Sequence, residues 1–303
     1  MSFREKTEVW VDREVARDSL LGKIISNLRK TGITREIRHF LVKSQYRKEK
    51  KNPTEKMIEA KVFFENQKEK IAFNAELLSD SESKDVYLKM IRFRYTHDIS
   101  EYPSYNLFNS YFVEGITPHE DNGVFIDCGA YTGDSAQSYL KYNSGNYKKI
   151  VCFEPDEENY NKLKRNFSSF DNVEIVKAGV WDSDTQLCFQ SGGGSASNVI
   201  DDNENVEGIV KIKVCSIDGN PYCQDATFIK MDIEGSEYNA LCGAVNVIKK
   251  NRPILAICIY HSNEDMIRLI QWINDLKLNY SFYVRQHSFD ESDTVLYAIP
   301  IGC

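Results

Sequence analysis

Long apolar runs are missing from this sequence. The longest, Ile254–Tyr260, has the length of a strand and falls far short of the ~20 residues that cross a bilayer. The opening residues, MSFREKTEVWVDRE, carry charges of both signs and lack the apolar region of a signal peptide. The sequence therefore predicts a chain without a membrane span, and we expect a cytoplasmic location.

The cysteine patterns of metal sites and disulfide frameworks are also missing. The eight cysteines form no CxxC pair, and no His/Cys cluster has metal-ligand spacing. Cys128, Cys152 and Cys258 lie inside apolar runs. We therefore expect them to be reduced and buried, where a thiol behaves as a small hydrophobic group.

An excess of basic residues is lacking as well. The formal net charge is −7 and the pI is about 5.4, so attraction to a phosphate backbone is weak and nucleic acid is not the expected partner. The composition, 42% hydrophobic and 27% charged, is that of a globular protein. A chain of 303 residues fits one large domain or two small ones.

Residues 1–120 contain little glycine and are charged, with apolar residues at helical spacing. The pattern predicts helices over Glu14–Lys30, Arg35–Lys51, Pro53–Ala75 and Ser83–Arg94. Arg35–Lys51 holds seven basic residues against two acidic ones, either as a solvated helix face or as a dock for an anionic substrate. This first region could recognise substrate, cap a cleft or form a homo-oligomer.

Residues 121–303 alternate between short apolar runs and helical stretches, and we treat them as a second region. Such alternation predicts an α/β fold with a doubly wound, mostly parallel sheet of seven strands. The expected strands are Val124–Cys128, Ile150–Phe153, Val173–Val176, Ala226–Met231, Ile254–Tyr260, Tyr280–Arg285 and Thr294–Ile299. The short loop between the last two requires an antiparallel pairing near the end of the sheet. Thr185–Gln190 and Ile209–Val214 predict an additional antiparallel pair.

The strongest local motif follows the first expected strand and reads Asp-Cys-Gly-Ala-Tyr-Thr-Gly-Asp over residues 127–134. A glycine turn between a strand and a helix lets a ligand approach the backbone. The GxGxxG pattern of nicotinamide enzymes is absent, and the flanking carboxylates would repel a pyrophosphate. They suit a cationic ligand, with candidate residues Asp127, Gly129, Ala130, Tyr131, Gly133 and Asp134.

Two further acidic positions follow strands. Glu154, with Pro155, ends the second strand 21 residues after Gly133, the place from which a carboxylate accepts ribose hydroxyls. Asp232 and Glu234 follow the expected strand Ala226–Met231, which should lie beside the first. These two carboxylates could bind substrate, act as a base or share a divalent cation such as Mg²⁺, or they could form a capping and salt-bridge network.

His261 comes at the carboxyl end of the strand Ile254–Tyr260. There an imidazole would face the cleft and could take a hydroxyl proton near neutral pH, although a structural role is equally consistent with the pattern. The glycine-rich stretch Ser191–Ser197 predicts either a lid over the ligand or a connector.

Taken together, these motifs resemble the FkbM-type family of S-adenosylmethionine-dependent methyltransferases. The resemblance covers about residues 121–299 and not residues 1–100. Its segments are FIDCGAYTGD, FEPD at 153–156, KAGVWD at 177–182, GGGSASN at 192–198, VCSID at 214–218, KMDIEGSEYNAL at 230–241 and AICIYH at 256–261. Many members of the family carry a carboxylate near the position of His261.

The resemblance implies a class I methyltransferase fold and methyl transfer from S-adenosylmethionine, leaving S-adenosylhomocysteine, to a hydroxyl of a glycan, a nucleotide- or lipid-linked sugar, or a natural product. It places the methionine part of the donor at Asp127, Gly129 and Gly133, the ribose at Glu154, and the adenine against Gly179, Val180 and Trp181. His261 or Asp232 would be the base. Alignment of the hydroxyl oxygen, methyl and sulfur would supply most of the rate gain.

Other classes fit less well. A nicotinamide oxidoreductase would need a third turn glycine. A nucleic-acid amino methyltransferase would need an (N/D)PP(Y/F) motif where this chain has DIEG. A non-catalytic binding module in a glycan assembly complex, with residues 1–120 as its interaction surface, would tolerate a degraded cofactor turn, but the turn is intact.

Overall fold

A computed structural model describes residues 35–107, 110–190 and 209–302. The helix predicted over Glu14–Lys30 and the glycine-rich stretch Ser191–Ser197 lie outside the described residues.

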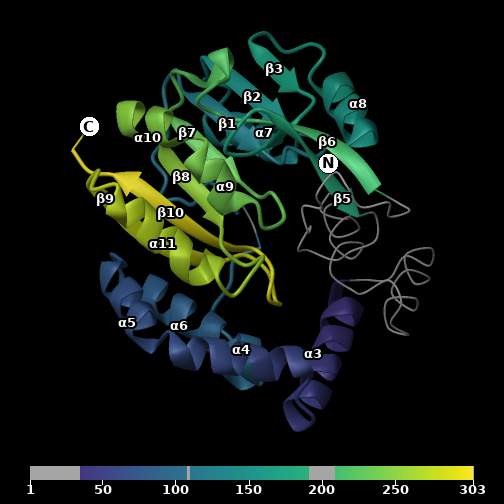
Figure 1. Ribbon diagram of the computed structural model, residues 1–303, viewed down its shortest axis with the longest axis vertical. Coiled ribbons are helices and arrows are strands. Elements are labelled where there is room, and N and C mark those ends of the chain that lie inside the picture. Colours follow the sequence, from purple (N-terminus) through teal and green to yellow (C-terminus); the bar gives the residue numbers. More distant parts are fainter. Residues whose placement is uncertain (1–34, 108–109, 191–208, 303) are drawn as a thin grey trace.

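A seven-stranded sheet forms the centre of the molecule, in the order β3-β2-β1-β7-β8-β10-β9 (Figure 1). Its strands are β1 (Val124–Cys128), β2 (Lys149–Phe153), β3 (Val173–Val176), β7 (Phe228–Met231), β8 (Ile254–Cys258), β9 (Tyr280–Gln286) and β10 (Thr294–Pro300). Only β10 is reversed, pairing antiparallel with both β8 and β9. The mostly parallel sheet with one antiparallel strand near its end is therefore confirmed.

Helices cover both faces of this sheet. Helices α7 (Asp134–Tyr142) and α8 (Glu157–Asn166) share a hydrophobic core with one face. Helices α9 (Glu237–Cys242), α10 (Val245–Asn251) and α11 (Asp265–Asp275) pack on the other. All five residues of β1 are buried because both faces of this central strand are covered.

A smaller sheet lies beside the central one, in the order β4-β6-β5. Strands β5 (Thr185–Gln190) and β6 (Ile209–Cys215) are antiparallel, as predicted. The two-residue strand β4 (Gly179–Val180) pairs parallel with β6, which the sequence pattern did not indicate. The described residues also include the short 3₁₀ helices η1 (Ile99–Glu101) and η2 (Pro221–Cys223).

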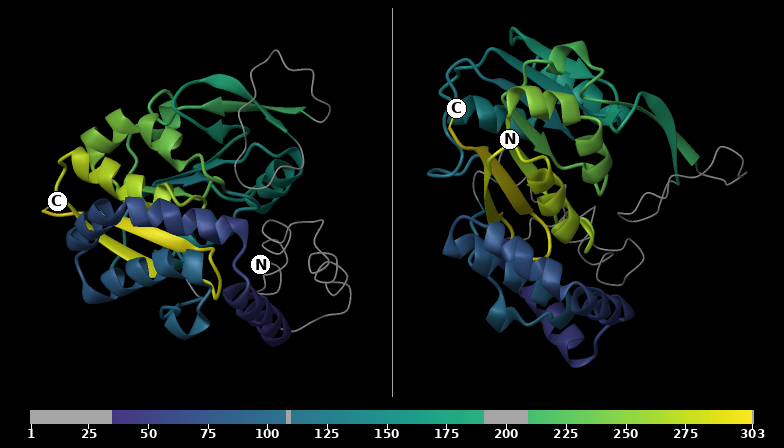
Figure 2. Two further views of the ribbon diagram at one scale, coloured as in Figure 1. Left: turned by 60° about the horizontal axis from the view of Figure 1, so that its bottom comes forward. Right: turned by 60° about the vertical axis from the view of Figure 1, so that its left-hand side comes forward.

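The described part of the N-terminal region is helical, with α3 (Arg35–Lys51), α4 (Glu55–Asn66), α5 (Lys68–Leu77) and α6 (Ser81–Thr96). Helix α6 packs along β9 and α5 packs against α11, whereas α4 packs on α5 and α6, and α3 contacts η1 (Figures 1 and 2). The Ser83 hydroxyl accepts a hydrogen bond from the Val284 amide at 3.0 Å, and Asn74 donates to the Ile267 carbonyl at 3.0 Å. Helices α4–α6 thus share a core with the sheet, and the division at residue 120 stays a prediction.

Two helical stretches, one of them predicted as a single helix, are each divided in the structure. The stretch Pro53–Ala75 forms α4 and α5, which are separated at Gln67. The helical stretch after β7 forms α9 and α10, with a break at Gly243. A Cβ at Gly243 would lie 2.1 Å from the Trp181 carbonyl oxygen, so this close approach requires glycine.

Cys128, Cys152 and Cys258 are free and buried, as predicted. Among the described residues, no helix has the length and apolar character needed to span a bilayer.

Candidate functional site

The turn after β1 is built on two glycines with positive φ. Gly129 has φ +81° and Gly133 has φ +95°, a region that side chains disfavour. A Cβ on Gly133 would lie 2.3 Å from the Phe167 ring. The backbone amides of Gly129 and Ala130 donate to the Phe153 carbonyl at 3.2 and 2.9 Å. These bonds fix the turn against the end of β2.

Glu154 joins the second motif to the first. The Tyr131 amide donates to its Oε2 at 2.8 Å, and the Asp156 amide donates to its Oε1 at 3.0 Å. The residue is 6% exposed. A carboxylate oxygen can accept two hydrogen bonds, and each oxygen of Glu154 accepts one from the backbone. The carboxylate therefore keeps acceptor capacity for hydroxyl groups. Pro155 follows it directly and fixes the backbone angle there.

Asp127 and Lys230 form a buried ion pair on adjacent strands. Lys230 Nζ lies 2.9 Å from Asp127 Oδ1 and also donates to the Gly129 and Cys128 carbonyls, at 2.8 and 3.2 Å. Burial disfavours its charge, but Asp127 and the nearby Asp232 outweigh this and raise the pKa of Lys230. The charge of Asp127 is therefore compensated within the protein, which the motif alone does not show.

Asp232 lies at the end of β7 and is held by two tyrosines. The Tyr111 hydroxyl donates to Oδ2 at 3.0 Å, and the Tyr260 hydroxyl donates to Oδ1 at 3.2 Å. The Tyr111 ring also lies over Lys230 Nζ, 5.2 Å from the ring centroid. Two phenol donors fix the orientation of the carboxylate at the edge of the sheet.

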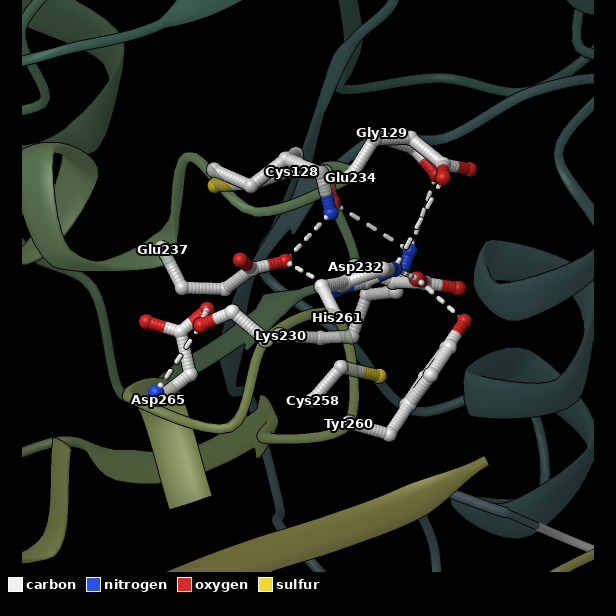
Figure 3. A network of polar contacts seen from close by, with 12 residues as sticks. Cys128, Gly129, Lys230, Asp232, Glu234, Glu237, Cys258, Tyr260, His261 and Asp265 are labelled. Carbon is white, nitrogen blue, oxygen red and sulfur yellow. Dashed lines mark hydrogen bonds and ion pairs between the residues drawn. The ribbon is translucent and has the colours of Figure 1, made fainter. Parts of the chain in front are cut away.

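His261 lies among carboxylates (Figure 3). Its Nδ1 is 3.0 Å from Glu237 Oε1, and its Nε2 is 3.4 Å from Asp232 Oδ1 and 3.8 Å from Glu234 Oε2. Burial alone would lower the pKa of His261, but the three carboxylates outweigh it and raise this pKa to about 10. His261 and Asp232, the two candidate bases, therefore lie side by side.

The loop after β7 presents Glu234 in a left-handed conformation, with φ +59°, followed by Gly235 at +95°. Among the described residues, no three or more histidine, cysteine, aspartate or glutamate side chains converge as metal ligands do. A cation shared by Asp232 and Glu234 alone stays a prediction.

The predicted adenine-side residues lie in the smaller sheet. Gly179 and Val180 form β4, and the Trp181 amide donates to the Cys215 carbonyl at 3.0 Å. These contacts tie the segment to β6, and its role toward a ligand stays a prediction.

The sequence motifs alone did not single out three residues of this edge. Tyr111 stands in a segment without a motif, 121 positions before Asp232. Glu237 belongs to the segment KMDIEGSEYNAL, which was the one signal for it. Arg94 of α6 donates to the Tyr260 carbonyl and, at 3.2 Å, to Asn263, so the N-terminal helices reach the residues beside His261.

The chain is similar in sequence and fold to a known methyltransferase. The chain is similar to a methyltransferase FkbM from Methylobacillus flagellatus, with 26% identity and a TM-score of 0.65 over 77% of this chain and 59% of that one. This chain thus covers less than two thirds of that relative's length. A fibrillarin from Aeropyrum pernix, solved with bound S-adenosyl-L-methionine, has 12% identity and a TM-score of 0.40 over 63% of this chain and 73% of its own.

An rRNA methylase from Streptococcus thermophilus has 13% identity and a TM-score of 0.37, over 60% of this chain and 89% of its own. No curated protein matches the sequence. The model of the methyltransferase FkbM domain matches residues 127–282, more than half of the 303 residues. The chain therefore belongs to the FkbM methyltransferase domain family.

Proposed function

We propose that the protein is an S-adenosylmethionine-dependent O-methyltransferase that acts on a hydroxyl of a carbohydrate, either a glycan or a nucleotide- or lipid-linked sugar, or of a similar metabolite. The observation that carries the proposal is the meeting of four strand ends. The turn after β1 contacts Glu154 after β2 and Asp232 after β7, and Asp232 contacts His261 after β8. In open α/β sheets this edge is where ligands bind.

The residues present fit an adenosyl ligand. The turn at Gly129 has no room for a side chain, and Glu154 is a buried carboxylate whose backbone partners fix its orientation. We assign the methionine part to Gly129, Ala130, Tyr131, Gly133 and Asp134, the ribose to Glu154 and Pro155, and the adenine to Gly179, Val180 and Trp181. Asp127 is fully buried and pairs with Lys230, which also donates to the Gly129 carbonyl, so we assign it the support of this turn. The bound donor supplies a methyl group activated by a sulfonium.

The acceptor hydroxyl would then lie beside Asp232 and His261, on the side of the site formed by β7 and β8. Tyr111 and Tyr260 hold Asp232 in place, so the site is organised before substrate binds. The preference for a carbohydrate rests on the C-terminal segments YSFYVRQHS and DTVLYAIP, which look like those of family members that methylate sugars and other hydroxylated compounds. A hydroxylated natural product is the alternative acceptor.

Calorimetric titration with S-adenosylmethionine, S-adenosylhomocysteine and NAD tests the donor. We expect micromolar binding of both adenosyl ligands, none of NAD, and loss of binding in Glu154→Ala. Glu158→Ala is the matched control, because that exposed glutamate pairs only with the neighbouring Lys162 of α8 among its described contacts. Absence of adenosyl binding in the intact protein would overturn the proposal and favour a binding module.

Methyl transfer from labelled S-adenosylmethionine to a panel of glycans, nucleotide sugars and phenolic or polyketide alcohols tests the acceptor. Label in the carbohydrates and not in the other alcohols is the expected result. The reverse distribution would replace the carbohydrate by a natural product while leaving the donor assignment in place.

A further inference from the structure

Carboxylate groups surround His261 on both sides of its ring. Glu237 of α9 faces Nδ1 at 3.0 Å, while Asp232 and Glu234, from the loop after β7, face Nε2 at 3.4 and 3.8 Å (Figure 3). The histidine side chain is only 3% exposed. Tyr260 packs on the ring, with 4.1 Å between the centroids.

This environment favours a ring with protons on both nitrogens. A neutral imidazole carries one N–H, so its other nitrogen would turn a lone pair toward a carboxylate oxygen. Neither ring nitrogen makes a well-directed hydrogen bond within the described residues, so the carboxylates act on the ring mainly through charge. The pKa of about 10 for His261 has the same origin, with the carboxylates outweighing burial.

Glu237 needs this positive charge. It is fully buried, and the Ile233 amide donates to its Oε1 at 2.8 Å. A buried carboxylate without a cationic partner is strongly destabilising, because desolvation is then uncompensated. The nearby Asp265 is also an anion, and its partners are Ser262 and Arg268 at 2.7 and 3.0 Å. Glu237 and His261 therefore form a buried ion pair.

We propose that Asp232, and not His261, takes the proton from the acceptor hydroxyl, and that Glu237 is a positioning residue that keeps His261 protonated beside Asp232. The proposal rests on the proposed function and adds the roles of the two carboxylates. A ring that already carries both protons has no lone pair with which to accept a third. The charged ring instead holds Asp232 ionised until the hydroxyl arrives.

Asp232 is also the better placed carboxylate. Its side chain is 17% exposed and fixed by Tyr111 and Tyr260, whereas Glu237 is fully buried. Glu234 is 40% exposed and farther from the ring, and serves as the comparison residue.

In the transfer, the hydroxyl oxygen bonds to the methyl carbon, the carbon–sulfur bond breaks with its electron pair going to sulfur, and the hydroxyl proton passes to Asp232. The products are a methyl ether, neutral S-adenosylhomocysteine and one proton.

The protonation state of His261 can be measured without any substrate. In the full-length protein with isotope-labelled histidine, the signal lost in His261→Asn identifies the ring. We expect that signal to keep imidazolium shifts from pH 5.5 to 8.5. Glu237→Gln should bring the titration of His261 into this pH range, whereas Glu237→Asp should leave the imidazolium shifts as in the wild type. Glu234→Gln should lower the pH at which His261 titrates by less than Glu237→Gln does.

Titration of wild-type His261 near pH 6.5 would overturn the proposal, and beyond the assignment by His261→Asn this result needs no other variant. An unchanged titration in a folded Glu237→Gln would remove the role of Glu237. In assays of transfer at saturating donor, we expect Asp232→Asn to lower kcat about 100-fold or more, the usual contribution of a general base. If kcat of the wild type rises with pH through a limb near 6.5, and this limb disappears in His261→Asn, the base role returns to His261.

Adenosyl binding and the charged state of His261 can be tested separately. Absence of adenosyl binding would overturn the proposed function and with it the base role of Asp232. The charged state of His261 would still be decided by the titration alone.

Discussion

Gly129 and Asp232 come into such close contact that no side chain fits between them: a Cβ on Gly129 would lie 2.1 Å from the Asp232 carbonyl oxygen. The two residues directly follow neighbouring parallel strands, β1 and β7, whose register pairs Cys128 with Met231. The turn that we assign to the donor and the carboxylate that we assign to the acceptor are therefore held together by backbone packing.

Gly129→Ala should disrupt this contact. The change combines a strained φ of +81° with a backbone clash that only movement of one strand end relieves, so we expect a loss of about 2–4 kcal/mol in unfolding free energy and of adenosyl binding. Gly115→Ala is the control, since φ there is +79° but nothing lies within 4 Å of the added Cβ. Equal losses in urea unfolding of the two variants would show that strain alone, and not the contact, sets the cost.

Lys230→Met should be among the most destabilising single changes in the sheet. It leaves Asp127 buried and without its cation, for which we expect about 3–5 kcal/mol in unfolding free energy. Lys148→Met removes an exposed partner of Asp225 and should cost less than about 1 kcal/mol. Similar midpoints for the two variants in chemical denaturation would contradict a structural role for the buried pair.

Pattern and topology predicted the backbone of the site. The strand ends at Asp127, Glu154 and Asp232 lie together because parallel strands β2, β1 and β7 are neighbours, and alternating strands and helices already imply such a sheet. Gly129 was predictable for the same reason, since a turn between a strand and a helix at this edge requires positive φ.

The side-chain partners were not predictable. Tyr111 reaches Asp232 across 121 positions, and Lys230 neutralises Asp127 across 103, and neither pairing leaves a periodic signal. The break at Gly243 likewise depends on the Trp181 backbone, which only the packed structure brings near. Local patterns specify elements, whereas the chemical state of His261 depends on carboxylates from two other segments.

Glu154→Gln should separate donor binding from stability. The amide keeps one oxygen acceptor for the backbone amides but loses the charge and one acceptor, so we expect adenosyl affinity to fall about 10- to 100-fold, equivalent to the 1.5–3 kcal/mol of charged hydrogen bonds. One of the two backbone amides then faces the N–H₂ group and loses its acceptor, so the midpoint of thermal unfolding should fall modestly while the protein stays folded. Calorimetry and thermal melting on the same sample measure both, and an unchanged affinity would remove Glu154 from the donor site.

His97 should give the protein a pH-dependent increment of stability. Its ring nitrogens lie 2.8 Å from Glu49 of α3 and 2.6 Å from Glu291 in the loop between β9 and β10. Burial would lower its pKa, but the two carboxylates raise it to about 9. Because the folded pKa exceeds the unfolded value of about 6.5, the stabilisation is complete below pH 6.5 and is lost as the pH rises through 9.

The measurement is urea unfolding of wild type and His97→Asn from pH 6 to 9.5. Asparagine tolerates the left-handed backbone at this helix C-cap, so the variant removes the ring and keeps the turn. We expect a difference of about 2 kcal/mol at pH 6 that shrinks toward pH 9.5. The raised pKa of His261 affects both proteins equally and cancels in the difference. His119→Asn changes an exposed ring and should leave the pH dependence of the unfolding free energy unchanged. A difference between wild type and His97→Asn that stays constant from pH 6 to 9.5 would show that packing, and not charge, joins α3 to the loop.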